Sequence, residues 1–349
     1  MRWYDPLLYP LSLCYDAVTK VRNRMFDLDI KKSHNFEVPN IVVGNLNVGG
    51  SGKTPMVEFL VEQFAEKHQL VVLSRGYGRK TSGFLMVNEN LGPLEVGDEP
   101  FQIFSKFKEK IQVAVGEKRV SAIASILKNY PDTDLILLDD AFQHRYLKAD
   151  FYILLTTYQK PFFDDQVLPL GRLRESKMGA SRADVVVVTK CPSDMGATER
   201  NSYKNRIAEF TSAKTIFSMI QYGEPISVLE NGIHVKPKAI VVSGIANDSL
   251  FVQECERRFE VVEKINYKDH HEYKVSEVKH IIGLVASHKD CMVITTEKDA
   301  VKLKKPSFHD YLVEIPIFAL PIKIKMTEKD QKYLLSQISN MIAEKAYRL

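Results

Sequence analysis

The chain has 349 residues, of which 45% are hydrophobic and 26% charged, and its formal net charge is +4. This balance is that of a globular protein, and it excludes a disordered, collagen-like or repeat-biased chain. The charge is too small to indicate a nucleic-acid partner. At roughly 100–200 residues per domain, the length favours two domains. The four cysteines show no zinc-ligand spacing, so a reducing compartment is expected.

The first expected element is an amphipathic helix. Its apolar residues recur in steps of three and four, as Tyr4, Leu7, Leu8, Leu11, Cys14, Tyr15, Val18, Val21 and Met25. The opposite face carries Ser12, Asp16, Thr19, Lys20, Asn23 and Arg24. Since prolines fit only near a helix start, the regular part is expected to begin around Leu7 to Pro10. The stripe fits a helix packed on its own protein, or one lying in a membrane interface with Trp3, Tyr4 and the leucines immersed.

Short apolar runs then alternate with helix-like stretches such as Pro55–Lys67 and Glu117–Leu127. The runs are Asn40–Val43, Leu70–Leu73, Ile111–Val115, Leu135–Leu138, Phe151–Leu155 and Asp184–Val188. Strands that are apolar on both faces and joined by helices indicate an α/β fold, a parallel sheet with helices on both faces. A second αβ series contains Ala239–Val242 and Met292–Thr295. We expect a boundary near residue 222, with residues 1–222 forming the first domain and 223–349 a smaller C-terminal α/β domain.

A phosphate-binding loop follows the first of these strands. Strand, glycine-rich turn, Lys-Thr and helix succeed one another as in P-loop NTPases, with the loop formed by Asn47, Val48, Gly49, Gly50, Ser51, Gly52, Lys53 and Thr54. Lys53 is expected to reach the β- and γ-phosphates and the Thr54 hydroxyl to bind Mg²⁺. The strict motif has glycine where Asn47 stands, and asparagine tolerates a positive φ better than most residues.

Two carboxylates end a later strand. Asp139 and Asp140 follow Leu135–Leu138, the form of a Walker B metal site, and at least one of them is expected to serve Mg²⁺. Guanine is usually read by an [NT]KxD motif, but here Thr189-Lys190-Cys191 is followed by Pro192, which favours ATP. No dinucleotide-binding GxGxxG follows a strand.

Three further segments carry ionisable groups. The loops Ser74–Lys80 and Leu168–Glu175 are basic and suit an anionic substrate, or are solvated surface. Asp98 either caps the helix that begins near Gly97–Pro100 or acts as a general base for an attacking hydroxyl. The run Asp269-His270-His271 is a poor metal pair, but a histidine there can hold a catalytic aspartate by a hydrogen bond.

The ordered set of motifs resembles the tetraacyldisaccharide 4'-kinase family of lipid A biosynthesis. The residues that carry the resemblance are Asn47–Thr54, Ser74–Gly78, Gly97–Pro100, Asp139–His144, Gly171–Glu175, Asp269–His271 and Thr296–Ala300. The resemblance implies transfer of the ATP γ-phosphate to the 4'-hydroxyl of a tetraacylated glucosamine disaccharide 1-phosphate, with Mg²⁺. It also implies a monotopic enzyme at the cytoplasmic face of the inner membrane, held there by the N-terminal helix, with no obligate protein partner.

The resemblance assigns roles to single residues. Asp98 is the expected base, paired with His270, and Lys53, Asp139 and Asp140 complete the catalytic set. Thr54 and Asp139 are the expected metal ligands. The candidate substrate-binding residues are Arg75, Tyr77, Arg119, Gln143 and Arg174. The alternatives are another P-loop enzyme of the same broad fold, such as a GTPase or metallochaperone, and a non-catalytic ATP sensor at a membrane.

Overall fold

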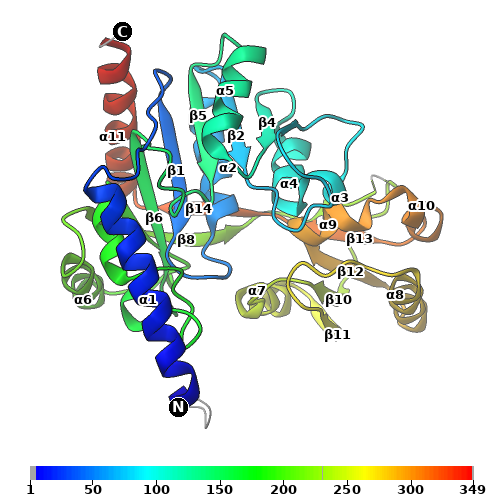
Figure 1. Cartoon of the computed structure of the whole chain (residues 1–349). Coiled ribbons are helices and arrows are strands. Elements are labelled where there is room, and N and C mark those ends of the chain that lie inside the picture. Colours follow the sequence, from blue (N-terminus) through cyan, green and yellow to red (C-terminus); the bar gives the residue numbers. More distant parts are fainter. Residues whose placement is uncertain (1–4, 230, 348–349) are drawn as a thin grey trace.

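The computed structural model describes residues 5–229 and 231–347, which form two α/β units (Figure 1). Within these residues the larger sheet has nine strands in the order β14-β8-β7-β6-β1-β5-β2-β4-β3. They are β1 (Asn40–Asn45), β2 (Leu70–Ser74), β3 (Leu85–Met86), β4 (Gln112–Val115), β5 (Leu135–Asp139), β6 (Phe151–Thr157), β7 (Val185–Thr189), β8 (Lys214–Tyr222) and β14 (Ile322–Met326). The strands from β8 to β4 are parallel, while β14 and β3 run antiparallel at the two edges.

Helices cover both faces of this sheet, as the sequence predicts. Alternate residues of one strand enter different cores, since Ile41 and Val43 pack on one side and Val42 on the other. The first side is covered by α2 (Lys53–Phe64), α3 (Pro93–Val96), α4 (Asp98–Phe107) and α11 (Glu328–Tyr347). The second is covered by α5 (Arg119–Asn129), α6 (Ala197–Ala208) and the 3₁₀ turns Phe162–Asp164 and Lys177–Arg182.

The second unit is built on a five-stranded sheet in the order β11-β10-β12-β13-β9. Its strands are β9 (Ile226–Ser227), β10 (Lys238–Ser243), β11 (Glu260–Asn266), β12 (Cys291–Thr296) and β13 (Ile317–Leu320). Its helices are α7 (Ser249–Arg258), α8 (Val275–Ser287), α9 (Glu297–Leu303) and α10 (Pro306–Leu312). The predicted runs Ala239–Val242 and Met292–Thr295 are β10 and β12, two of its three inner strands.

The expected domain division needs a correction at the C-terminal end. β8 ends at Tyr222, where the boundary was expected. The chain then returns to the first domain, because β14 pairs with β8 and Leu334 and Ile338 of α11 are fully buried in the core of the large sheet. The prediction that all of 223–349 forms the smaller domain is therefore wrong for β14 and α11. The pairing of β14 with β8 joins segments on either side of the second domain, and no local sequence pattern predicts it.

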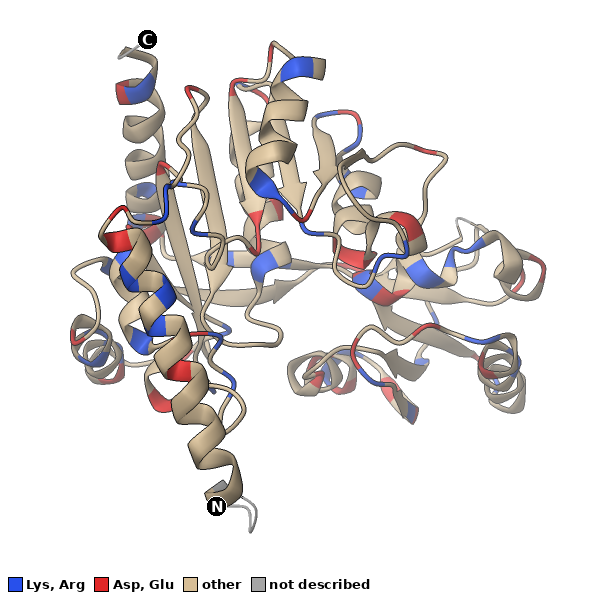
Figure 2. Cartoon of the chain, viewed as in Figure 1, with Lys and Arg blue, Asp and Glu red and all other residues tan. Residues whose placement is uncertain are grey.

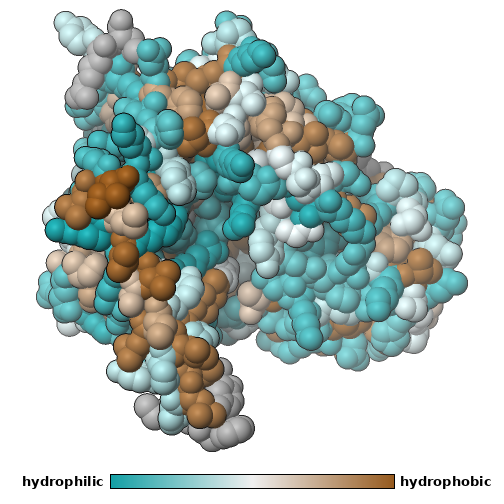
Figure 3. Space-filling model, in the orientation of Figure 1, coloured by the Kyte–Doolittle hydropathy of each residue, from teal (hydrophilic) through white to brown (hydrophobic). Residues whose placement is uncertain are grey.

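The N-terminal helix α1 (Asp5–Asp27) begins earlier than expected and contains Pro10. Its polar face lies on the protein, because Ser12 Oγ donates to the Val167 carbonyl and Asn23 Nδ2 donates to Glu175 Oε2 at 2.6 Å. Its apolar face is exposed, as Figure 3 shows, through Leu7, Leu11, Tyr15, Val18 and Val21. A helix packed through its apolar stripe is excluded for the described part of α1. Trp3 and Tyr4 lie outside the described residues.

Candidate active site

The phosphate loop joins β1 to α2 in the expected strand–turn–helix order. Gly49 and Gly52 have φ of 110° and 85°, in the region where other residues are strained, and Gly52 directly precedes α2. Asn47 has no positive φ. Its side-chain Nδ2 instead donates to Asp165 Oδ2 at 2.8 Å, and its carbonyl accepts from Asn45 Nδ2 at 2.6 Å. Asn47, which replaces the glycine of the strict motif, therefore anchors the loop through these hydrogen bonds. It does not supply the positive φ that the sequence suggested.

Lys53 opens α2 and points toward the carboxyl end of the sheet. Its Nζ lies 3.3 Å from Asn45 Oδ1 and 3.6 Å from Asp140 Oδ1. Thr54 follows it in the first turn, where helix N–H groups and the helix dipole favour an anion. The [NT]KxD-like segment also supports the loop, because Lys190 Nζ donates to the Gly50 carbonyl at 2.9 Å.

The two carboxylates at the end of β5 lie in opposite environments. Burial and the neighbouring Asp140 charge raise the pKa of Asp139 to about 6. Burial also acts on Asp140, but the charges of Lys53 and Arg174 outweigh it and lower the pKa of that carboxyl. Arg174 Nη1 lies 2.7 Å from Asp140 Oδ1. Asp140 is thus already paired with cations, whereas Asp139 is not.

Asp139 fits the expected metal role. Its Oδ2 accepts a hydrogen bond from Ser74 Oγ at 3.2 Å, while Oδ1 is buried without a partner among the described residues. A buried, unpaired carboxylate oxygen is costly, and a cation offsets that cost. Within 5–229 and 231–347 no three His, Cys, Asp or Glu residues converge on a metal position. This suits Mg²⁺, which takes few protein ligands and completes its shell with water and phosphate oxygens.

Asp98 is the first residue of α4 and does not cap it, since Gly97 is the N-cap and no side-chain cap bond forms. Its Oδ2 lies 3.2 Å from His270 Nδ1 and 3.3 Å from Lys302 Nζ. The sequence prediction that His270 pairs with Asp98 across the two domains is reproduced by this geometry. In Figure 2 the ribbon segments coloured for acidic and for basic residues lie next to one another where α4 meets the second domain.

The expected substrate-binding residues divide into exposed and buried groups. Arg75 is exposed, and Tyr77 is 65% exposed with its ring 5.2 Å from that of His270. Arg119 is only 2% exposed and donates to the carbonyls of Gly116 and Asp139. Arg119 therefore holds the end of β5 in place. Its guanidinium is buried, unlike the exposed side chains of Arg75 and Tyr77.

Gln143, another expected substrate-binding residue, is half-buried, and its side-chain amide is bound to other residues of the protein. Its Nε2 donates to the Asn45 carbonyl at 2.9 Å and to Glu175 Oε1 at 3.0 Å. Its neighbour His144 has no role that the sequence pattern predicts. Burial and the charges of Arg119, Arg22 and Arg75 lower the pKa of His144 to about 4. Arginines from α1, from the loop Ser74–Lys80 and from the start of α5 thus act on one histidine, which makes its surroundings a suitable place for an anionic group.

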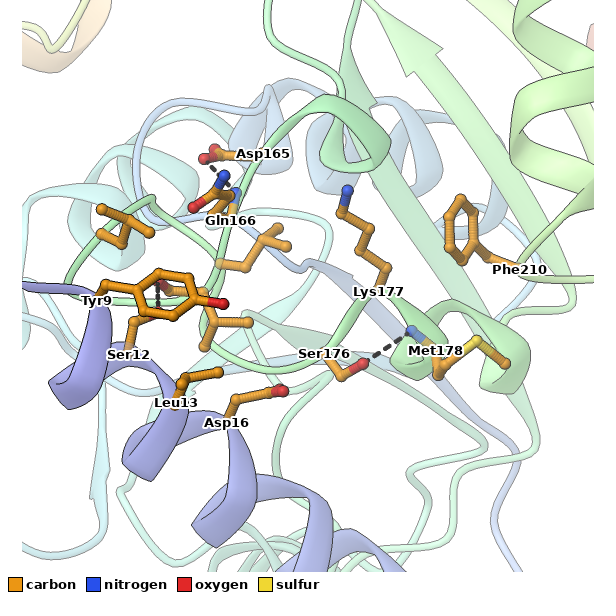
Figure 4. Close-up of a pocket in the computed structure, with 13 residues that line it drawn as sticks. Tyr9, Ser12, Leu13, Asp16, Asp165, Gln166, Ser176, Lys177, Met178 and Phe210 are labelled. Carbon is orange, nitrogen blue, oxygen red and sulfur yellow. Dashed lines mark hydrogen bonds between the residues drawn. The ribbon is translucent and has the colours of Figure 1, made fainter. Parts of the chain in front are cut away.

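Two pockets flank the loop Asp165–Glu175. One, of about 100 Å³, lies between the phosphate loop and Ala246 and Asn247 of the second domain. The other, of about 310 Å³, lies between the loop and α1, with Tyr9, Ser12, Leu13 and Asp16 facing Gln166 and the segment from Ser176 to Met178 (Figure 4). The loop contacts both the phosphate loop and α1, because Val48 N donates to the Arg172 carbonyl and Tyr15 Oη to that of Arg174.

The comparisons with known proteins agree with this geometry. The family model described as Tetraacyldisaccharide-1-P 4'-kinase matches residues 4–342. The chain belongs to this family. It is 39% identical over 339 residues to the tetraacyldisaccharide 4'-kinase of Flavobacterium psychrophilum, covering 95% of this chain and 96% of that protein. It is 36% identical to the enzyme of the same name from Bacteroides fragilis strain YCH46, with 97% and 93% covered.

A solved structure is also similar over nearly the whole chain. The crystal structure of the "apo" form of LpxK from Aquifex aeolicus in complex with ATP has a TM-score of 0.75 and 28% sequence identity. The match covers 96% of this chain and 99% of that one. Membership of the 4'-kinase family makes the chain a kinase with this two-domain α/β fold.

Proposed function

We propose that this kinase transfers the γ-phosphate of ATP to the 4'-hydroxyl of a tetraacylated glucosamine disaccharide 1-phosphate in lipid A biosynthesis. The observation that carries the proposal is the meeting of a phosphate loop, a buried carboxylate with one unpaired oxygen and the Asp98–His270 pair. Glu99, the neighbour of Asp98, acts electrostatically on Asp139, so the first turn of α4 lies near the metal site. Phosphoryl transfer depends mainly on positioning and charge neutralisation, which these groups supply.

Each group has a distinct task in the proposed reaction. Loop N–H groups and Lys53 hold the β- and γ-phosphates. Thr54 and Asp139 would hold Mg²⁺, which would supply charge neutralisation at the phosphate oxygens. Asp98 takes the proton from the acceptor hydroxyl as the new O–P bond forms. ADP leaves with the electron pair of the broken bond.

His270 donates to Asp98 in a defined tautomer. Lys298 Nζ lies 3.2 Å from His270 Nε2, and an ammonium can only donate, so Nε2 is the acceptor. The ring hydrogen is then on Nδ1, which donates to Asp98 Oδ2. This arrangement orients the Asp98 carboxylate.

We also propose that α1 lies in the interface of the inner membrane, on its cytoplasmic face. A helix bound to its own protein by polar contacts, with exposed leucines and valines on the outside, suits the headgroup boundary. None of the described helices is long and apolar enough to cross a bilayer. The 1-phosphate of the substrate would then meet the arginines beside His144, which lie next to α1.

The test is transfer of labelled γ-phosphate from ATP to the disaccharide 1-phosphate in detergent micelles, comparing wild type with Asp98→Asn. We expect wild-type transfer, a loss of about 10²–10⁴ in kcat for the variant, and unchanged ATP affinity by calorimetry. Folded wild type that binds MgATP but never phosphorylates this lipid would falsify the proposed function. Loss of ATP binding in Asp98→Asn would instead contradict the base role alone.

A further inference from the structure

A buried lysine of the second domain contacts the proposed base. Lys302 lies on α9 and its side chain is 3% exposed. Its Nζ lies 3.3 Å from Asp98 Oδ2 and 3.3 Å from Asp299 Oδ1. A lysine is almost never buried to this degree without anionic partners, and here each domain supplies one.

Asp299 is anchored independently of Asp98. It is fully buried, and its Oδ2 accepts from Gly244 N and from Thr296 Oγ1, each at 2.8 Å. Gly244 is required for this approach, because a Cβ there would lie 2.9 Å from Asp299 Oδ1. Two elements of the second domain, the end of β10 and the start of α9, therefore fix Asp299, and Asp299 in turn fixes Lys302.

The donors on Asp98 converge on one oxygen. His270 and Lys302 both contact Oδ2. Oδ1 is thus the oxygen available to receive a proton, and it is held in place because its partner oxygen is bound from two directions. A base positioned in this way retains its orientation when substrate arrives.

We propose that Lys302, anchored by Asp299, is a positioning residue that keeps the Asp98 carboxylate ionised and correctly oriented for proton transfer. The inference rests on the proposed function, in which Asp98 is the base. It assigns a task to the Thr296–Ala300 motif, whose individual contacts the sequence left unassigned: Asp299 holds Lys302, and Lys298 sets the tautomer of His270.

Several charged groups act on Asp98. From the second domain these are Lys302 and Lys298, with Asp269 paired to Lys298, and from α4 itself Glu99, also paired to Lys298, while His270 contributes a hydrogen bond. Burial raises the pKa of Asp98, but the hydrogen bond from His270 and the charges of Lys302 and Lys298 hold it below its usual value. Loss of the Lys302 charge therefore raises this pKa. Because the base acts when ionised, the acidic limb of the rate profile then moves to higher pH.

The experiment measures kcat and kcat/KM for lipid phosphorylation from pH 3 to 9, a range that includes the usual pKa of an aspartate, in wild type, Lys302→Met, Lys302→Arg and Lys304→Met. Lys304 is an exposed lysine at the end of the same helix and serves as the matched control. We expect Lys302→Met to lower kcat at least tenfold and to raise the acidic limb by about one pH unit, the effect of removing a cation close to a carboxylate. Lys302→Arg keeps the charge and restores the position of the limb, while Lys304→Met matches wild type.

A double variant guards against unfolding. Lys302→Met leaves Asp299 as an uncompensated buried charge, so Lys302→Met/Asp299→Asn removes both charges and is expected to fold. It should show the same shift of the acidic limb, with unchanged ATP affinity. If both variants phosphorylate the lipid at the rate of the wild type and their acidic limbs do not shift, the inference alone is overturned. If the wild-type enzyme itself does not phosphorylate the lipid, the proposed function is overturned instead.

Discussion

At the scale of single residues, identical side chains differ in role because their surroundings differ. Asp139 and Asp140 are consecutive, yet burial raises the pKa of the first while Lys53 and Arg174 lower that of the second. The residue pattern predicts both carboxylates at the strand end, and only the family resemblance singles out Asp139 as the expected metal ligand. The unpaired Oδ1 of Asp139 favours that residue as the ligand. Pairs of groups whose pKa values are pushed apart commonly mark an active site.

The raised pKa of Asp139 predicts a pH-dependent cost to stability. Above pH 6 the metal-free protein holds a buried charge, whereas below about pH 4 the carboxyl is neutral in both folded and unfolded states. We expect Asp139→Asn to raise the free energy of unfolding of the metal-free protein by about 1–3 kcal/mol at pH 8. The gain should vanish as the pH falls through 6 to 4.

Urea unfolding at several pH values, with and without Mg²⁺ and ATP, measures this effect. Mg²⁺ with ATP should stabilise the wild type at pH 8 more than Asp139→Asn, because the amide of the variant lacks the negative charge of the carboxylate. A gain in stability that does not change with pH would contradict the assignment of the buried charge.

At the scale of elements, α1 shows what an amphipathic pattern leaves open. Its residues predict a helix with one apolar stripe, and the structure has that helix. Which face meets the protein depends on the partner surface, and here Glu175 and the Val167 carbonyl bind the polar face. The usual orientation of surface helices, apolar face inward, is reversed here, and this reversed orientation is the one that the proposed membrane contact requires.

The exposed stripe predicts membrane binding that can be removed without unfolding. We expect Leu7→Ser/Leu11→Ser/Val18→Ser to lower partitioning into phospholipid vesicles containing anionic lipid by on the order of 100-fold, since each side chain loses its apolar transfer energy. The melting temperature should stay unchanged, because these side chains are 59–69% exposed.

A matched control tests the location of the effect. Val235→Ser/Val275→Ser/Val313→Ser removes three exposed valines of the second domain. Its partitioning should equal that of wild type in a vesicle sedimentation assay. Equal losses in both triple variants would argue for non-specific adhesion rather than an interfacial helix.

At the scale of the whole molecule, the two domains are connected at both ends and across their interface. The chain leaves the large sheet after β8 and re-enters it at β14. The interface between the domains has its own contacts, because Lys106 Nζ of α4 lies 2.6 Å from Glu58 Oε2 of the first domain and 3.1 Å from Glu297 Oε1 of α9 in the second. Glu297 Oε2 also accepts from Ile322 N, at the point of return. The second domain is thus inserted between β8 and β14 of the first. Its position determines where His270 and Lys302 lie relative to Asp98.

This topology predicts that the C-terminal helix stabilises the nucleotide-binding domain. Leu334 of α11 is fully buried beneath the large sheet. We expect Leu334→Ala to lower the free energy of unfolding of that domain by about 2–5 kcal/mol. ATP binding should therefore be lost at lower urea concentration than in wild type. Asn340→Ala, an exposed position of the same helix, is the control and should behave as wild type. An unchanged midpoint for Leu334→Ala would contradict the packing of α11.

The sequence by itself determined the local elements and the groups with local signatures. Central strands are apolar on both faces, and the phosphate loop and the Asp139-Asp140 pair are contiguous, so period and spacing are enough to predict them. Only the tertiary structure decided the polar attachment of α1, the return of β14 and α11, the inward direction of Arg119 and Gln143, and the link from Asp299 through Lys302 to Asp98. These depend on contacts between residues far apart in the chain, and such contacts follow from packing and burial rather than from neighbouring residues.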